Sequence, residues 1–222
     1  MVWDPIWEKV FREKDWGKYP PEELIRFIAR NFYSVPDRSQ VKILEVGCGP
    51  GANIWYFARE GFDVYGVDGS GTAIERAGNR VRQEDLAAHL KMADVISLST
   101  CFPDIQFDAV IDVTCLQCNR IEAVRSVVSQ TFDILKPGGN FFSMMIAEGS
   151  YGEGLGEEVA PHTFRNISEG PCVNAGLNHF FTLDEVQDLM SSFSNVSIEY
   201  SIRSMNNRQH VLKHWIAQGQ KS

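Results

Sequence analysis

Three glycines spaced two residues apart, Gly47, Gly49 and Gly51, form the stretch of this chain whose spacing most directly suggests chemistry. Because glycine lacks a Cβ, its backbone reaches positive φ without strain and lets a ligand approach the main chain closely. An apolar run from Val41 precedes the glycines, and a helical pattern from Ala52 follows them. This order predicts a buried strand, a tight turn and a helix whose N-terminus faces the turn, which is half of a nucleotide-type binding site.

Acidic residues stand at corresponding places further along the chain. Asp68, Asp94 and Asp112 each lie at or near the end of an apolar stretch that predicts a strand. The carboxyl ends of parallel strands meet at one edge of a sheet, and ligands bind there. We therefore expect these acids to lie beside the glycine turn.

Strands and helices are predicted to alternate along residues 41–147. The predicted strands cover residues 41–46, 62–68, 89–95, 107–113 and 140–147, and the predicted helices between them cover residues 52–60, 72–82 and 121–135. This alternation indicates an α/β fold with a mostly parallel sheet covered by helices on both faces.

The chain of 222 residues, 44% of them hydrophobic, is predicted to form a single domain. We expect an N-terminal helical cap at residues 1–34, a cofactor-binding core at 41–147, an insertion or lid at 148–181, and a C-terminal helix with two strands at 182–222. Glycine is frequent in the insertion, and its predicted place above the carboxyl edge favours a lid over a disordered loop.

Both ends of the chain carry readable helix and strand signals. Pro20 and Pro21 precede a helical pattern from Glu22, and Thr182 followed by Glu185 has the spacing of a capping box. That last helix is expected to reach about residue 193, before two antiparallel strands at 196–202 and 210–217. The aromatic residues before Pro20 have two readings, a packed helix or a lid over a small ligand.

The formal net charge of −8 argues against some partners. No basic field is available to attract phosphates, so nucleic acid and anionic membranes are disfavoured. The sequence shows no secretory signal pattern and no apolar run of transmembrane length, so we expect a cytoplasmic protein. An oligomeric state is not indicated.

Five cysteines, Cys48, Cys101, Cys115, Cys118 and Cys172, are an odd number in a chain large enough to fold without disulfides. Free thiols are therefore expected. Cys115 and Cys118 form a CxxC pair, but no second pair accompanies them, so we expect small buried side chains and no metal site.

The order of motifs resembles that of the class I S-adenosylmethionine-dependent methyltransferases, in particular the small-molecule, type 11-like branch. The motifs are Glu45 before GCGPG, Asp68, Ala-Asp-Val at 93–95, FDAVID at 107–112 and LKPGG at 135–139. The resemblance implies a Rossmann-like three-layer sandwich with a mostly parallel seven-stranded sheet and an antiparallel last strand. It also implies S-adenosylmethionine as the cofactor and a small-molecule methyl acceptor, methylated at oxygen or nitrogen.

The resemblance further implies which residues hold the cofactor. Glu45 would orient the turn and the cofactor's amino group, Asp68 would accept from the ribose hydroxyls, and Asp94 with Val95 would bind adenine. Thr114 and Cys115 would lie near the methionine portion and the methyl group. The full expected set is Glu45, Gly47, Cys48, Gly49, Gly51, Asp68, Gly69, Ser70, Asp94, Val95, Thr114 and Cys115. Glu45 and Asp112 could instead cap backbone amides at this edge, and Asp68 could cap a helix. Gly69 and Ser70 could merely shape the turn.

Methyl transfer is an in-line displacement, so a general base is needed only when the acceptor must lose a proton. His162 and His179, in the insertion, are the candidate bases, because imidazole titrates near neutral pH. His89, His210 and His214 fall on predicted strands and are weaker candidates. Residues expected to line an acceptor pocket are Trp3, Trp7, Trp16, Tyr19, Phe164 and Arg165.

Two other classes of protein remain open. A nucleotide-dependent oxidoreductase shares the fold class, but the chain has GxGxG where a dinucleotide site requires GxGxxG. A non-catalytic module that binds the cofactor would keep the same edge residues.

Overall fold

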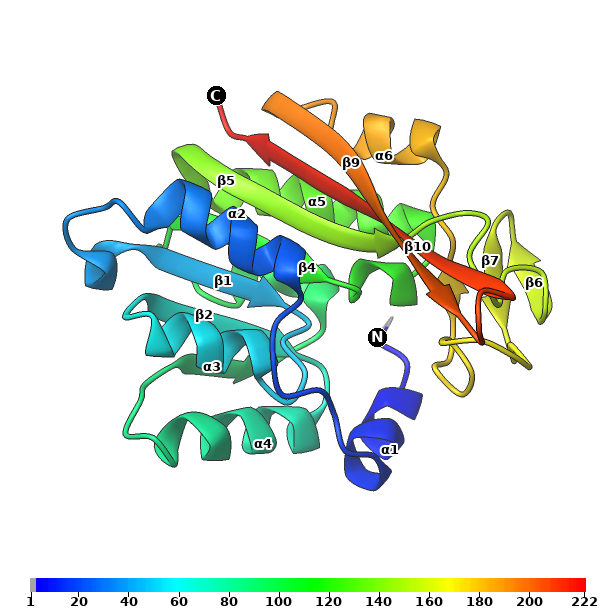
Figure 1. The fold of residues 1–222 in the computed structure, drawn as a ribbon. Helices are drawn as coiled ribbons and strands as arrows, with labels where there is room; N and C mark the ends of the chain where they lie inside the picture. Colours follow the sequence, from blue (N-terminus) through cyan, green and yellow to red (C-terminus); the bar gives the residue numbers. More distant parts are fainter. Residues whose placement is uncertain (1–2) are drawn as a thin grey trace.

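The computed structural model describes residues 3–222, and its centre is a sheet of seven strands (Figure 1). The strands of this sheet are β1 (Lys42–Val46), β2 (Asp63–Asp68), β3 (His89–Met92), β4 (Phe107–Val113), β5 (Leu135–Ile146), β9 (Ser194–Met205) and β10 (His210–Gln220). Their order across the sheet is β3-β2-β1-β4-β5-β10-β9.

Strand β10 is antiparallel to both of its neighbours, whereas the pairs among β1 to β5 are parallel. The chain therefore has the predicted mostly parallel, seven-stranded, Rossmann-like sheet with an antiparallel last strand. The weak third strand, predicted over residues 89–95, is present and is shorter, ending at Met92.

Helices cover both faces of the sheet (Figure 1). Those on one face are α2 (Glu22–Phe32), α3 (Ala52–Arg59) and α4 (Gly71–Arg82), and those on the other are α5 (Ile121–Ile134) and α6 (Leu183–Leu189). Ile43 of β1 packs in the first hydrophobic layer with Phe27 and Phe57, and its neighbour Leu44 packs in the second with Val127 and Val186. Successive residues of β1 are thus buried on opposite faces, as a central parallel strand requires.

The N-terminal region contains two helices. The helix α2 begins directly after Pro21, as predicted, and buries Leu24 and Ile28 completely against the sheet. The short helix α1 (Ile6–Glu13) lies away from the sheet and contacts α4, at the edge where the parallel strands end (Figure 1).

The insertion at 148–181 contains ordered secondary structure. Three short strands, β6 (Glu157–Ala160), β7 (Thr163–Arg165) and β8 (Asn178–His179), form a second antiparallel sheet. Phe164 and Phe180 pack there with Ile146 and Leu212 of the main sheet. A small hydrophobic core therefore fixes this segment, which the spacing of its glycines did not indicate.

Other boundaries differ from those predicted. Strand β5 pairs from Leu135, opposite Phe107, and the register shifts before Asn140, because the Lys-Pro-Gly-Gly segment forms an irregularity within the strand. The capping box of α6 is present: Thr182 accepts from the amide of Glu185, and Glu185 accepts from the amide of Thr182. That helix ends at Leu189, earlier than expected.

No helix among residues 3–222 combines the length and the apolar character needed to cross a membrane.

Candidate functional site

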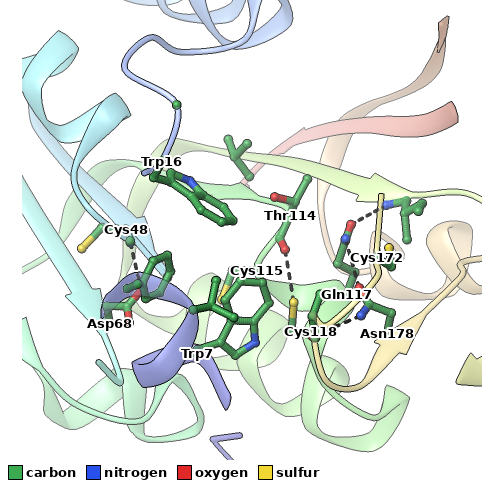
Figure 2. Close-up of a pocket in the computed structure, with 18 of the residues that line it drawn as sticks. Trp7, Trp16, Cys48, Asp68, Thr114, Cys115, Gln117, Cys118, Cys172 and Asn178 are labelled. Carbon is green, nitrogen blue, oxygen red and sulfur yellow. Dashed lines mark hydrogen bonds between the residues drawn. The ribbon is translucent and has the colours of Figure 1, made fainter. Parts of the chain in front are cut away.

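A cavity of about 380 Å³ lies at the carboxyl edge of the parallel strands. This volume is in the range of small-molecule sites. Its walls come from the glycine turn, the N-terminal segment, residues 171–175 of the insertion and the start of β10. Figure 2 shows Asp68 and Cys48 at one end, Gln117 and Asn178 at the other, and Trp7 and Trp16 facing Thr114 and Cys115 between them.

Close packing on both sides of the turn requires glycine at Gly47 and Gly51. Gly47 and Gly51 have φ of 66° and 81°, in the left-handed region that side chains disfavour. A Cβ at Gly47 would overlap the thiol of Cys115, and one at Gly51 would lie 2.7 Å from the Cβ of Ala77 in α4. The turn therefore brings the main chain close to β4, to α4 and to the cavity at once.

Asp68, at the end of β2, holds the turn in place. Its Oδ2 accepts from the amide of Gly49 at 2.9 Å, and its Oδ1 accepts from the amide of Ser70 at 2.8 Å. Burial raises the pKa of Asp68, while these two amide hydrogen bonds act in the opposite direction. Each carboxylate oxygen retains a further acceptor site, so the geometry leaves room for hydroxyl donors from a ligand.

Glu45 and Asn53 carry two buried oxygens that lack a partner among the described residues. Asn53 donates from Nδ2 to Glu45 Oε1 at 2.6 Å, whereas Glu45 Oε2 and Asn53 Oδ1 have no hydrogen bond. Both residues line the cavity beside the glycine turn. A buried polar atom without a partner is costly, so this pair of acceptors suits a ligand that brings N–H donors, above all a cationic ammonium group.

Three buried carboxyl groups, Glu45, Asp68 and Asp112, lie along this edge. Burial raises the pKa of Glu45 well above its usual range, and the charges of Asp68 and Asp112 raise it further. Burial raises the pKa of Asp112 to about 6. Of the three, Glu45 and Asp68 line the cavity and Asp112 does not. A positively charged ligand beside Glu45 and Asp68 would offset the cost of ionising them, whereas the phosphates of a dinucleotide would add to that cost.

The chain is strained where β4 ends. Thr114 has φ of 61°, which is a genuine outlier for a β-branched residue. Its amide donates to the carbonyl of Met144 at 2.8 Å, and Asp112 Oδ1 accepts from the amides of Cys115 and Leu116, both at 3.0 Å. These bonds hold the strained segment against the cavity, and strain of this kind clusters at ligand sites.

The structure brings together most of the residues that the resemblance implied. Those that line the cavity are Glu45, Gly47, Cys48, Gly49, Asp68, Gly69, Asp94, Val95, Thr114 and Cys115. Gly51 and Ser70 do not line it: Gly51 packs on α4, and Ser70 is the N-cap of α4, where its hydroxyl accepts from the amide of Ala73.

The two candidate histidine bases lie elsewhere, and neither lines the cavity. His162 is partly exposed and lies beside Glu153, with 3.2 Å between its Nδ1 and the carboxylate. His179 is fully buried, with Nδ1 2.8 Å from the Thr163 hydroxyl and Nε2 3.3 Å from Glu185. His179 thus joins the insertion to the capping box of α6, and neither residue is placed to take a proton from a ligand in this cavity.

A different histidine, His214, lines the cavity. It pairs with Ile146 near the start of β10. The antiparallel direction of β10 brings its beginning to the edge where the parallel strands end. The sequence predicts this antiparallel last strand, and the strand's direction already places His214 near the carboxyl edge. From the sequence, however, the histidines of the insertion are the stronger candidates.

Two buried amides complete the end of the cavity beyond Thr114. Gln117 accepts from the amide of Ile146 at 2.8 Å and donates to Asn178, which donates to the carbonyl of Ala175 (Figure 2). Gln117 and Asn178 are 61 positions apart, and no spacing in the sequence indicates that they meet.

All five cysteines are free. Burial, followed by nearby carboxylates or thiols, raises the pKa of Cys115 and Cys118 well above the usual range, which keeps both thiols protonated. Cys118 donates from Sγ to the carbonyl of Thr114 at 3.6 Å. Within residues 3–222, no three or more His, Cys, Asp or Glu side chains are grouped so that they could hold a metal ion.

Residues 43–139 match the family described as "Methyltransferase domain". This segment runs from β1 into β5 and contains the glycine turn, Asp68 and Asp94. Together with the Rossmann-like sheet, the match confirms the resemblance to class I S-adenosylmethionine-dependent methyltransferases. S-adenosylmethionine is the cofactor of this class.

Curated relatives of known name are also methyltransferases. The chain is 32% identical over 99 residues to a demethylmenaquinone methyltransferase of Tropheryma whipplei, a match that covers 44% of this chain and 38% of the relative. It is 24% identical over 172 residues to a malonyl-[acyl-carrier protein] O-methyltransferase of Enterobacter lignolyticus, covering 78% and 60%. The matches thus span less than two thirds of the length of either relative.

A solved structure has the same fold over nearly the whole chain. The N-methyltransferase NodS from Bradyrhizobium japonicum, in complex with S-adenosylhomocysteine, superimposes with a TM-score of 0.64 at 15% identity and covers 98% of this chain and 99% of its own. At that identity the likeness establishes the fold.

Proposed function

We propose that this protein is an enzyme that transfers a methyl group from S-adenosylmethionine to a small-molecule acceptor bound in the same cavity. The observation that carries the proposal is the pair of unpartnered buried oxygens on Glu45 and Asn53, beside a glycine turn that matches the methyltransferase domain family. An ammonium group is the donor that these oxygens lack, and the cofactor's methionine portion ends in one.

The other implied residues are proposed to hold the rest of the cofactor. Asp68 would accept from the ribose hydroxyls with the acceptor sites that its two amide bonds leave free. Asp94 and Val95 would contact adenine, and Thr114 with Cys115 would flank the sulfonium. When bound, S-adenosylmethionine supplies an electrophilic methyl group that an acceptor displaces in line. The carboxyl groups of Glu45 and Asp68, which line the cavity, favour this cation over NAD.

The acceptor is proposed to lie between the N-terminal aromatic residues and the start of β10. Trp7, Phe11 and Trp16 form an aromatic cluster with ring centroids 5.2 to 6.0 Å apart, and all three line the cavity. Ile146 and Leu212 line the opposite side. These walls exclude water and suit a flat, largely apolar acceptor. Of the pocket residues expected earlier, Phe164 and Arg165 do not line the cavity.

His214 is proposed as the group that takes a proton from the acceptor. It lies two strands from β4, which at the usual spacing between neighbouring strands is about 10 Å from the end of β4. A ring-sized acceptor is proposed to lie between Thr114 and this imidazole, both of which line the cavity. Within the described residues no hydrogen bond engages the imidazole, and burial lowers its pKa to about 4, so it is a neutral proton acceptor at physiological pH.

All four predicted parts of the chain contribute to one cavity, which supports the proposal that residues 1–222 act as a single domain. Asp4 and Trp7 come from the cap, whose first two residues lie outside the described ones. Glu45 comes from the core, Cys172 from the insertion and His214 from the C-terminal part. The insertion thus forms a fixed wall through its residues 171–175 and 178, while its strands β6 and β7 lie outside the cavity.

Calorimetry with S-adenosylmethionine, S-adenosylhomocysteine and NAD tests the cofactor. We expect the two sulfur compounds to bind and NAD to give no heat. Binding of NAD alone would favour an oxidoreductase and overturn the proposal. A screen of hydroxylated and aminated aromatic compounds with isotopically labelled methyl donor then tests catalysis. Cofactor binding without labelled product across the screen would favour a binding module.

A further inference from the structure

The N-terminal segment, residues 3–16, is bound directly to the end of the cavity that the adenosine portion of the cofactor is proposed to occupy. Two of its residues make the decisive contacts, Trp3 and Glu8, and each touches a loop that follows a parallel strand. We call residues 3–16 the strap.

Trp3 lies on the loop after β2. A Cβ added at Gly69 would overlap the indole of Trp3, so the ring is in contact with the backbone there. The amide of Trp3 donates to Asp94 Oδ2 at 3.0 Å. The side chain of Trp3 therefore places a flat ring on Gly69, while its main-chain N–H donates to Asp94; adenine likewise has a flat ring and an N–H donor.

Glu8 fastens the strap to the N-terminus of α4. Its carboxylate accepts from the hydroxyls of Ser70 and Thr72, each at 2.5 Å, and from the amide of Thr72 at 3.4 Å. The two hydroxyl hydrogen bonds lower the pKa of Glu8 to about 2. A carboxylate at a helix N-terminus is electrostatically favourable, so Glu8 stays charged and hydrogen-bonded to the start of α4 at physiological pH.

Further contacts hold the strap at both ends. Arg76 of α4 donates to the carbonyls of Lys14 and Arg12, at 3.0 and 3.4 Å. On the opposite side of the cavity, Asp4 lies 3.6 Å from the guanidinium of Arg165 in the insertion. The strap thus crosses the cavity from α4 to the insertion.

We propose that Trp3 is an intramolecular substitute for adenine, so that the strap closes the adenosine end of the cavity and the cofactor must displace Trp3 to bind there. This inference rests on the proposed function, because it assumes that Gly69 and Asp94 receive the adenine. The proposal makes Trp3, and not the rest of the strap, a competitor of the adenine portion. The glycine turn and Glu45, at the methionine end, lie outside the contact of Trp3.

Calorimetry on Trp3→Ala tests the inference with three probes: S-adenosylhomocysteine, adenosine and methionine. The apparent dissociation constant equals the intrinsic one divided by the fraction of protein whose site is open, so a site that is mostly closed binds more weakly. We expect Trp3→Ala to bind S-adenosylhomocysteine and adenosine at least threefold more tightly than the unmodified protein, with methionine binding unchanged. Glu8→Gln should also tighten the binding of S-adenosylhomocysteine and adenosine, because it removes the charge that binds the strap to the start of α4. Tyr200→Ala, an exposed aromatic residue on β9 outside the cavity, is the matched control and should change none of the three.

Unchanged or weaker binding of adenosine by Trp3→Ala, with binding by the unmodified protein intact, would overturn the inference and make Trp3 part of the bound site. If neither form bound S-adenosylhomocysteine, the proposed function itself would fail. Thermal unfolding of each variant without ligand shows whether it is folded. Should Trp3→Ala unfold, Trp3→Leu and Glu8→Gln supply the same comparison.

Discussion

Asn53 donates to one carboxylate oxygen of Glu45 beside the glycine turn, and the other oxygen is buried without a hydrogen-bond partner among residues 3–222. The side chain is therefore held in orientation by a bond that does not satisfy it. In Glu45→Gln the remaining oxygen can still accept from Asn53, while an amide replaces the free acceptor and faces the ligand's ammonium. A lost hydrogen bond to a charged group is worth about 1.5 to 3 kcal/mol, so we expect S-adenosylhomocysteine to bind about 10- to 100-fold more weakly by calorimetry.

Two comparisons make this prediction specific to Glu45. Binding of 5′-methylthioadenosine, which lacks the amino acid portion, should be unaffected by Glu45→Gln. Glu60→Gln changes a carboxylate paired with Arg38 outside the cavity and should leave both ligands unaffected. Because burial raises the pKa of Glu45, removing its ionisation should also raise the melting temperature of the ligand-free protein at neutral pH. Equal weakening of both ligands would show that Glu45 is not at the amino group.

Asp68→Ala should weaken binding of S-adenosylhomocysteine and of 5′-methylthioadenosine together, since both contain ribose. The expected loss is on the order of 1 to 3 kcal/mol, from hydroxyls left without an acceptor and from a glycine turn released at Gly49. Calorimetry measures the loss. Asp63→Ala, at the other end of the same strand, removes the partner of Lys42 outside the cavity and is the control. Unchanged affinity in Asp68→Ala would show that the ribose does not bind at Asp68.

Local spacing explains how much of this arrangement the sequence predicts. Gly47, Gly49 and Asp68 meet because the ends of two neighbouring parallel strands must meet, and the apolar pattern of those strands is unambiguous. The alternation of strands and helices likewise determines the order of the core, and the capping box at Thr182 marks the last helix. In each case the residues that interact are close in sequence or belong to adjacent elements.

The contacts that the sequence does not predict join distant segments through single side chains. Trp3 reaches Gly69 and Asp94, and Gln117 reaches Asn178, with no repeated pattern that selects one partner over another. For His179, the residue type suggests a role that its surroundings in the fold do not support. Its residue type suited a base, but the small sheet of the insertion buries it against Thr163 and Glu185, and that packing depends on the whole fold.

His214→Asn should lower kcat about 100-fold once an acceptor is known, at the lower end of what proton transfer to a positioned base contributes, because the lowered pKa makes His214 a weaker base. The pKa of about 4 predicts an acid limb near pH 4 and a plateau at neutral pH. Burial is the largest cause of the lowered pKa, Glu23 raises it and Arg203 lowers it further. The limb should therefore move to lower pH in Glu23→Gln and to higher pH in Arg203→Ala. A limb that moves in neither variant would assign the titration to another group.

The same lowered pKa makes a prediction about stability. The unfolded chain binds a proton to His214 below about pH 6.5, whereas the folded protein does so only near pH 4. The free energy of unfolding should therefore fall as the pH is lowered through this window. His214→Asn should lose less stability than the unmodified protein between pH 6.5 and 4.5, as measured by urea denaturation. Ile202→Ala, at an exposed apolar residue of β9, is the control and should keep the slope of the unmodified protein.

Asp112 should have the opposite dependence on pH. Burial raises its pKa from 3.8 to about 6, against the hydrogen bonds from Ser143 and from the amides of Leu116 and Cys115. Between these two values the folded protein binds more protons than the unfolded chain, so this group lowers the free energy of unfolding as the pH rises from about 4 to 6. The full cost, about 3 kcal/mol, applies above pH 6.

Asp112→Asn removes this titration and keeps the shape of the side chain. Its amide oxygen can accept from both backbone amides, and the Ser143 hydroxyl, which donates to Asp112 at 2.6 Å, can turn to accept from the new amide nitrogen. We expect the stability of Asp112→Asn relative to the unmodified protein to be greater at pH 7.5 than at pH 4.5, by urea denaturation at both values. Ser143→Ala removes one bond that favours the carboxylate, so it should raise the pKa of Asp112 further and steepen the dependence. A difference between Asp112→Asn and the unmodified protein that is the same at both pH values would show that Asp112 does not titrate in this range.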